Sequence, residues 1–321
     1  MEIGKMLIPI VSSFAITIIL LPLFIGYFRM KKEGQVIREE GPKWHEKKSG
    51  TPTMGGVVFI LAIAITSFWV GAWTQTLTHN LLLTVFILLL YGVVGFLDDF
   101  IKLAKKRNEG LTPLQKLSGQ LLGGIIFLWV YYADKLPHTL MIPGIGAITN
   151  KIIYSLFVLF WLIGFSNAVN LTDGIDGLVS GLGIISFATY AIIAAHEQND
   201  GILVVCLAVI GGLIGFLLFN HKPAKIFMGD VGSLALGGTL AAISILLHRE
   251  FSLLLIGLVY VIETASVMLQ VSWFHMTGKR IFKMTPIHHA FEMSGWNEWQ
   301  IDLSFWAFAI VCSALYLWIF L

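Results

Sequence analysis

Residues 202–219, ILVVCLAVIGGLIGFLLF, form a run of apolar residues and glycines without a single charge. A helix needs roughly 17 to 25 such residues to cross the hydrocarbon core of a bilayer, so this run is long enough to span it. The whole chain of 321 residues is 57% hydrophobic and 12% charged, whereas a soluble domain devotes about a quarter of its residues to charge. The composition therefore predicts an integral membrane protein.

Similar runs recur on both sides of this segment. They predict ten spans, at residues 5–28, 54–73, 80–98, 117–133, 152–169, 177–195, 202–219, 231–247, 252–274 and 299–320. The first run is too long for the apolar region of a signal peptide, and no small-residue cleavage site follows it. We therefore expect an all-α integral membrane fold, a bundle of about ten transmembrane helices that forms one polytopic domain over residues 1–321.

The loops between these spans alternate between rich and poor in lysine and arginine. One set holds 17 of the 21 basic residues, namely Arg29, Lys31, Lys32, Arg38, Lys43, Lys47, Lys48, Lys102, Lys105, Lys106, Arg107, Lys116, Lys222, Lys225, Lys279, Arg280 and Lys283. The positive-inside rule places this set in the cytoplasm and both termini outside. Orientation alone can account for most of these lysines. The net charge of +2 gives no argument for a nucleic-acid partner.

The outer loop at residues 134–150 is rich in turn-forming residues. Pro137, Pro143, Gly144 and Gly146 favour a short periplasmic hairpin there. The loop shows no residues that suggest chemistry, so we expect the function to lie at the cytoplasmic face.

Five aspartates lie at the cytoplasmic ends of the spans: Asp98, Asp99, Asp173, Asp176 and Asp230. Ionised groups near the membrane interior are costly, which points to function. Plain explanations exist as well, because such residues can reach interfacial water or cap turns and helices. If the loops converge, carboxylates so close together need protons or a cation. Ligation by oxygen alone favours magnesium or manganese.

Basic and imidazole side chains extend this hypothesis to phosphoryl transfer. Lys48, Lys102 and Lys225 beside a metal ion would suit a pyrophosphate. The last cytoplasmic loop contains His288 and His289, which could bind phosphate or sugar hydroxyls, although a solvated interfacial loop is the alternative. In the ninth span Glu263 and the residue seven positions later, Gln270, share a helix face, and interhelical hydrogen bonding is their favoured role.

Five motifs in order carry a resemblance to a known family. They are GTPTMGG at 50–56, GFLDD at 95–99, NAVNLTDGIDG at 167–177, FMGD at 227–230 and PIHH at 286–289. They resemble those of the polyprenyl-phosphate N-acetylhexosamine-1-phosphate transferase family, and most closely its phospho-N-acetylmuramoyl-pentapeptide transferases. The resemblance covers nearly the whole chain.

The resemblance implies a fold, a reaction and a location. It implies a ten-helix bundle, commonly a homodimer, in the bacterial cytoplasmic membrane, with the active site facing the cytoplasm. It further implies transfer of phospho-MurNAc-pentapeptide from UDP-MurNAc-pentapeptide to undecaprenyl phosphate, which forms lipid I, releases UMP and requires Mg²⁺.

Roles for individual residues follow from the same resemblance. Asp98 corresponds to a base or orienting group for the lipid phosphate, Asp99 to its partner, and Asp230 to a metal ligand. The family's nucleotide pocket corresponds to Lys48, Thr53, Asn170, Asp173, Gly174, Asp176 and Phe227, with Phe227 stacking on uracil. His288, taken as catalytic, and His289 match a histidine motif near the sugar and phosphates. Where the family usually has a third histidine this chain has Ala290, for which we expect altered donor contacts rather than loss of activity.

Two other functions are weighed against this one. Within the same class, the chain could transfer GlcNAc-1-phosphate from UDP-GlcNAc to undecaprenyl phosphate. From a different class, an ion-coupled secondary transporter would also carry intramembrane acids. Transporters place such acids near the bilayer midplane, whereas here they gather at one face.

Overall fold

The computed structural model describes residues 3–31, 48, 50–107, 109–142, 144 and 146–321. Their elements are α1 (Ile3–Lys31), α2 (Gly56–Trp73), α3 (His79–Lys105), α4 (Pro113–Ala133), β1 (Leu140–Ile142), β2 (Gly146–Ile148), α5 (Lys151–Thr172), α6 (Leu178–His196), α7 (Asp200–Asn220), α8 (Gly229–Leu246), α9 (Ser252–Ile256), α10 (Leu258–Thr277), α11 (Ile287–Glu292) and α12 (Glu298–Phe320). Of the predicted basic loop residues, Lys32, Arg38, Lys43 and Lys47 lie outside the described residues.

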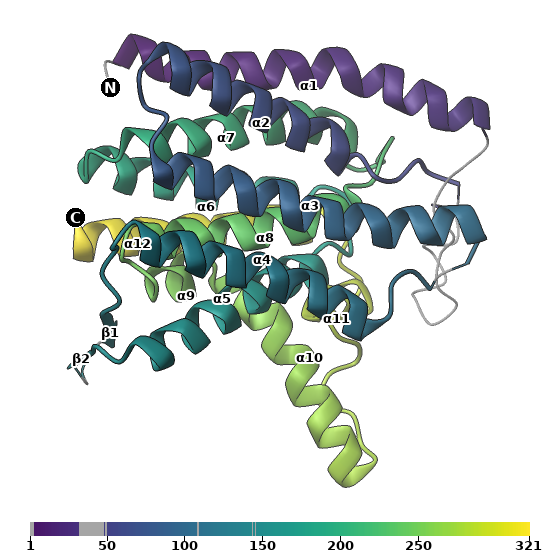
Figure 1. The fold of residues 1–321 in the computed structure, drawn as a ribbon. Helices are drawn as coiled ribbons and strands as arrows, with labels where there is room; N and C mark the ends of the chain where they lie inside the picture. Colours follow the sequence, from purple (N-terminus) through teal and green to yellow (C-terminus); the bar gives the residue numbers. More distant parts are fainter. Residues whose placement is uncertain (1–2, 32–47, 49, 108, 143, 145) are drawn as a thin grey trace.

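Most of the long helices run side by side along one axis, and the two chain ends lie at the same end of the bundle (Figure 1). Within the described residues, eight helices are long and apolar enough to cross a membrane, and α4 and α10 are the long helices that are not among them. The strands β1 and β2 pair antiparallel, with Leu140 opposite Ile148. The predicted all-α membrane architecture and its short hairpin are thus confirmed, and the orientation in the membrane stays a prediction.

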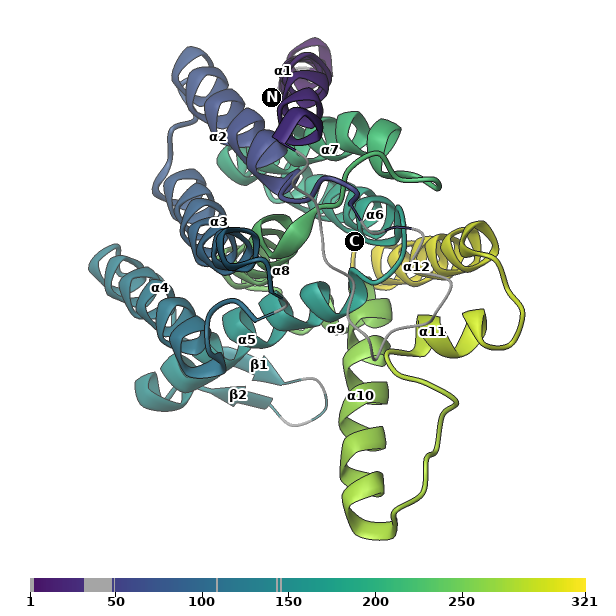
Figure 2. The ribbon, with the colours of Figure 1, turned by 90° about the vertical axis from the view of Figure 1, so that its right-hand side faces the viewer.

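Helix α8 lies in the middle of the bundle, between α3 and α5 (Figure 2). All its residues from Val231 to Leu246 are buried. Where α3 meets α8, a β-carbon placed on Gly95 would lie 2.1 Å from the carbonyl oxygen of Asp230. Only glycine allows two backbones to approach so closely. The close approach brings the last turns of α3 against the first turn of α8.

The third helix is longer than predicted. The span was expected to end at residue 98, but α3 continues to Lys105 and is followed by Lys106 in a left-handed conformation, with φ of 48°. Lys102 lies about one turn beyond Asp98 and Asp99 and forms ion pairs with both. Opposite charges at this spacing support a helix. Asp98 and Asp99 therefore project sideways from α3 instead of ending it.

The prediction of one ninth helix over residues 252–274 was wrong. The segment divides at Gly257 into the short α9 and the long α10, and α10 leaves the bundle at a steep angle (Figures 1 and 2). The amide of Gly257 donates to the carbonyl of Leu253 at 2.8 Å and closes α9. Both pieces are apolar, so hydrophobicity along the chain did not reveal the break.

Candidate active site

Three of the predicted aspartates meet where α3 crosses α8. Each of Asp98, Asp99 and Asp230 offers a carboxylate oxygen, and these three oxygens lie within 4.8 Å of one another. Asp98 and Asp99 are buried. We call these three residues the aspartate cluster.

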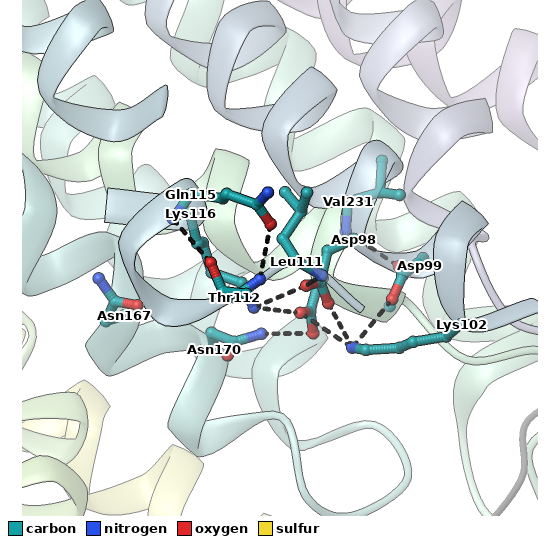
Figure 3. A network of polar contacts seen from close by, with 12 residues as sticks. Asp98, Asp99, Lys102, Leu111, Thr112, Gln115, Lys116, Asn167, Asn170 and Val231 are labelled. Carbon is teal, nitrogen blue, oxygen red and sulfur yellow. Dashed lines mark hydrogen bonds and ion pairs between the residues drawn. The ribbon is translucent and has the colours of Figure 1, made fainter. Parts of the chain in front are cut away.

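Two lysines approach the aspartate cluster from different helices (Figure 3). Nζ of Lys102 lies 2.5 Å from Asp98 Oδ2 and 3.2 Å from Asp230 Oδ2. Nζ of Lys116, on α4, lies 2.8 Å from Asp230 Oδ2 and 3.4 Å from Asp98 Oδ1. Three carboxyl groups thus face two ammonium groups, and carboxyl groups so close together need either shared protons or a further cation.

Neutral hydrogen-bond donors fix the orientation of the same carboxylates. The side-chain amide of Asn170 donates to Asp230 Oδ1 at 2.9 Å. The backbone amide of Val231 donates to Asp99 Oδ2 at 3.2 Å, and that of Leu111 donates to Asp98 Oδ1 at 2.8 Å. Each aspartate is therefore held by a different part of the chain, and little reorganisation is needed when charge develops nearby.

The aspartate cluster could hold a divalent cation. Its donors are all carboxylate oxygens from three residues, which suits Mg²⁺ or Mn²⁺ better than a soft metal. The arrangement fits such an ion by ligand type and by the short separation of the oxygens. Lys102 now lies among these oxygens, so a bound ion would compete with its ammonium group.

A cavity of about 380 Å³ opens beside the aspartate cluster. Its lining combines charged, polar and apolar side chains. The lining residues are Asp98, Lys102, Gly110, Leu111, Pro113, Lys116, Leu117, Gln120 and Asn167. The cavity can therefore take a ligand with a charged end and a hydrocarbon part.

A second group of charges lies apart from the aspartate cluster and has its own partners. Nζ of Lys48 lies 2.6 Å from Asp176 Oδ1 and 2.9 Å from Glu298 Oε2, and Lys222 forms an ion pair with Glu298. The backbone amide of Asp176 donates to Glu298 Oε2 at 3.0 Å, and the backbone amide of Ala224 donates to Asp176 Oδ2 at 3.0 Å. We call Lys48, Asp176, Lys222 and Glu298 the lysine clamp. Burial lowers the pKa of Lys48, but Glu298 and Asp176 outweigh this effect and raise it.

The pKa of Asp173 depends on charges in both the aspartate cluster and the lysine clamp. It follows the last residue of α5. Burial, together with the carboxylates of Asp230, Asp99 and Asp176, raises its pKa to about 8, although Lys48 opposes the shift. Without a cation Asp173 is therefore largely protonated at neutral pH, and a nearby cation would favour its ionised form.

The segment before α2 lies directly beside the segment before α8. The amide of Phe227 donates to the carbonyl of Pro52 at 2.8 Å, and that of Gly55 donates to the carbonyl of Phe227 at 2.9 Å. Thr53, between these bonds, is buried, and Phe227 is partly exposed. Two motifs that are far apart in the sequence thus form one wall near the aspartate cluster.

The two histidines have different surroundings. His288 is fully buried, and its Nδ1 lies 3.1 Å from Oε1 of Glu263 on α10. Nδ1 of His289 lies 2.6 Å from Oε2 of Glu292 within α11. A β-carbon on Gly174 would lie 2.2 Å from Nε2 of His288. His288 therefore touches the loop that carries Asp173, not the aspartate cluster itself.

The structure brings together some of the predicted site residues and separates others. Asp98, Asp99 and Asp230 meet, and Lys102 and Asn170 join them. Asp176 lies outside the aspartate cluster and pairs with Lys48 in the lysine clamp. Interhelical hydrogen bonding was expected of Glu263 and Gln270. Gln270 instead accepts hydrogen bonds from the backbone amides of Ile281 and Phe282 in the loop after α10, and Glu263 lies 3.1 Å from Nδ1 of His288.

Sequence reasoning missed three charged residues. Lys116 was counted only among the basic loop residues, although it contacts both Asp98 and Asp230. The positive-inside rule likewise accounts for Lys222, and Glu298 was not predicted as a site residue, although the two residues form an ion pair. A signal existed for Glu298, since it is an acid at the first residue of a membrane-length helix, where a charge is costly unless it is paired.

An apolar helical bundle with clustered carboxylates and lysines at one end defines a membrane-embedded phosphotransferase. A model of glycosyl transferase family 4 matches residues 81–248, and the phospho-N-acetylmuramoyl-pentapeptide-transferase signature 1 matches residues 48–60. The chain belongs to the phospho-N-acetylmuramoyl-pentapeptide-transferases of this family.

Curated relatives with that printed name are similar over their full lengths. The protein of Latilactobacillus sakei is 67% identical over 317 residues, which cover 99% of each chain. That of Lacticaseibacillus paracasei is 64% identical over 321 residues, covering 100% of each chain, and that of Enterococcus hirae is 64% identical over 319 residues, covering 99% of each.

Proposed function

We propose that the chain transfers phospho-MurNAc-pentapeptide from UDP-MurNAc-pentapeptide to undecaprenyl phosphate, forming lipid I in peptidoglycan synthesis. The observation that carries the proposal is the aspartate cluster with Lys102 and Lys116, at one end of a bundle that is 67% identical to such a transferase. The substrates are a soluble nucleotide sugar and a membrane lipid, so the site must lie where both can reach it.

The reaction is a direct displacement at phosphorus. An oxygen of the lipid phosphate attacks the sugar-bearing phosphorus of the donor, and the bond from that phosphorus to the bridging oxygen breaks. UMP leaves with the bridging oxygen and its electron pair, so no oxidant or further reactant is needed. Because a lipid phosphate is already largely ionised at neutral pH, the protein chiefly positions the groups and stabilises charge.

The lipid phosphate is assigned to the cavity beside Asp98. Lys102 and Lys116 would hold its oxygens, and Asp98 would orient the attacking one, with Asp99 as its partner. Leu111, Pro113 and Leu117 supply the apolar part of the wall, which suits the first isoprene units. This assignment explains why charged and apolar side chains share one cavity.

Asp230, with Asp98 and Asp99 in reach, would hold Mg²⁺. When bound, this ion supplies positive charge that polarises the phosphoryl oxygens and stabilises the departing phosphate. The chain's own contribution is to keep the three carboxylates close and to orient Asp230 through Asn170.

The donor is assigned to the side of the cluster where the loops meet. Phe227 would stack on uracil beside Thr53 and Gly174, while Asp173 and Asn170 would lie near the pyrophosphate. The lysine clamp brings Lys48 and Asp176 to the edge of this region, and His288 and His289 would lie near the sugar. The homodimer, the cytoplasmic membrane and a cytoplasmic site remain parts of the proposal.

One assay of the purified protein in detergent tests this function. Undecaprenyl phosphate and Mg²⁺ are supplied with UDP-MurNAc-pentapeptide or with UDP-GlcNAc, and release of UMP is measured. We expect release with the first donor only. Release with UDP-GlcNAc alone would support the GlcNAc-1-phosphate transferase, and ion-driven uptake by proteoliposomes without UMP release would support a transporter.

A further inference from the structure

A fully buried acid and imidazole meet where α10 crosses α11. Glu263 and His288 have no exposed surface, and Oε1 of Glu263 lies 3.1 Å from Nδ1 of His288. Within the described residues, neither ring nitrogen of His288 and neither carboxylate oxygen of Glu263 has an aligned hydrogen-bond partner, so the Nδ1–Oε1 approach is a close contact between two groups that can still rotate into line. Buried polar groups with unused hydrogen-bonding capacity are costly, so the pair calls for a reason beyond packing.

The free nitrogen of His288 points at the loop between α5 and α6. A β-carbon placed on Gly174 would lie 2.2 Å from Nε2 and 2.8 Å from Cε1 of His288. The imidazole thus occupies the space that any other residue at position 174 would need. Gly174 directly follows Asp173, whose raised pKa reports the nearby charges of Asp230 and Asp99.

The same face of α10 holds the chain that leads into α11. Seven residues after Glu263, Gln270 accepts hydrogen bonds from the amides of Ile281 and Phe282 at 2.9 and 3.0 Å. Helix α10 leaves the bundle. These hydrogen bonds hold the loop between α10 and α11 against α10 as the chain returns toward the bundle. His288 is therefore held from α10 while its ring contacts the α5–α6 loop.

We propose that Glu263 is a positioning residue that acts through His288: it holds Nδ1–H and so presents Nε2 to the Asp173–Gly174 loop on the donor side of the site. The inference rests on the proposed function and adds a residue to it. A carboxylate behind an imidazole fixes its tautomer and ring orientation, as such partners do for metal-bound histidines. Glu263 itself touches neither substrate.

The test compares Glu263→Leu and Glu263→Gln with the wild-type protein. We expect Glu263→Leu to raise the KM for UDP-MurNAc-pentapeptide about tenfold or more, and the KM for undecaprenyl phosphate to change by less than about twofold. Glu263→Gln should recover part of the loss, because its amide oxygen can still accept from Nδ1–H. Donor affinity is also measured by thermal stabilisation, which does not depend on turnover.

Glu250→Leu is the matched control. Glu250 is also buried and accepts a hydrogen bond from Tyr154 at 2.9 Å, so its loss should lower the unfolding temperature without selectively raising the donor KM. The pair Glu263→Leu and His288→Asn supplies a double-mutant cycle. If Glu263 acts through His288, the double variant should lose no more donor affinity than His288→Asn alone.

Three results would overturn the inference. They are an unchanged donor KM in Glu263→Leu, fully additive losses in the double variant, and an equal rise of both KM values with lowered stability. Failure of the proposed function looks different, because then the wild-type protein itself would neither release UMP nor be stabilised by the donor.

Discussion

The aspartate cluster and the lysine clamp are made of the same residue types but differ in how their charges are satisfied. In the lysine clamp two carboxylates meet two lysines, the amide of Asp176 donates to Glu298 Oε2, and the amide of Ala224 donates to Asp176 Oδ2. In the aspartate cluster three carboxylates meet two lysines beside a cavity.

This difference separates a structural connection from a reactive site. The lysine clamp joins the segment before α2, two loops and the start of α12, so its value lies in holding those segments together. The aspartate cluster and its two lysines lie beside a cavity, so the carboxyl groups can bind a cation and the lysines a phosphate. Mutations should therefore affect stability at one place and turnover at the other.

The largest effect is expected at the aspartate cluster. Asp230→Asn should lower kcat by about 10²–10³-fold, because it removes one charge from the only place where three carboxylates approach within the described residues. UMP release measures the loss, and thermal unfolding should change little. The control is Asp134→Asn, whose carboxylate pairs with the exposed His79 at the hairpin end. A loss of stability large enough to account for the loss of activity would contradict the comparison.

The lysine clamp should show the opposite pattern. Glu298→Ala leaves Lys48, Lys222 and the amide of Asp176 without their shared partner, which should cost about 3 kcal/mol of stability. Thermal unfolding in detergent measures this change, with the exposed Glu109→Ala as the control. If the folded fraction lost as much kcat as Asp230→Asn does, the clamp would belong to the chemistry.

Asp173 joins the two regions and should make stability depend on pH. Its pKa of about 8 in the folded protein lies far above the ordinary carboxyl value. A raised folded-state pKa means that the stability due to the protonated form is complete at acidic pH and is lost as pH rises through about 8. The metal-free protein should unfold at a lower temperature at about pH 9 than at about pH 6.

Asp173→Asn provides the comparison for this pH effect. The variant should lose the part of the pH dependence of stability that is due to this carboxyl. In the wild-type protein, added Mg²⁺ should reduce the pH dependence of stability, since a cation favours the ionised form. Identical profiles of unfolding temperature against pH for the variant and the wild type would show that Asp173 does not titrate in this pH range.

The smallest effect is expected where the chain departs from the family. Ala290→His restores a third imidazole on α11, next to His289 and outside both charged groups. We expect a change of a few fold in the KM for the nucleotide donor, about 1 kcal/mol, and no change in the Mg²⁺ dependence of kcat. A shift in metal dependence without one in donor KM would refute this expectation.

Much of the fold was readable from the sequence because spanning a bilayer imposes a length and a composition. The all-α membrane architecture and the hairpin followed from apolar runs and turn residues. The break at Gly257 did not, since glycine is tolerated inside many helices and the segments on both sides of it are apolar. The extension of α3 was not predicted because Asp98 and Asp99 mark the end of the apolar run, whereas the ion pairs of Lys102 with these two residues stabilise another turn of helix.

The sequence by itself determined which residues could do chemistry: acids, lysines and histidines placed at one end of bilayer-length segments. Only the tertiary structure decided which of them meet: Asp230 joins Asp98, Asp176 joins Glu298, Lys116 contacts Asp230, and Glu263 lies beside His288. The reason is distance. Lys102 and Asp230 are 128 positions apart yet 3.2 Å from each other, and that contact depends on a close helix crossing that no local pattern along the chain encodes.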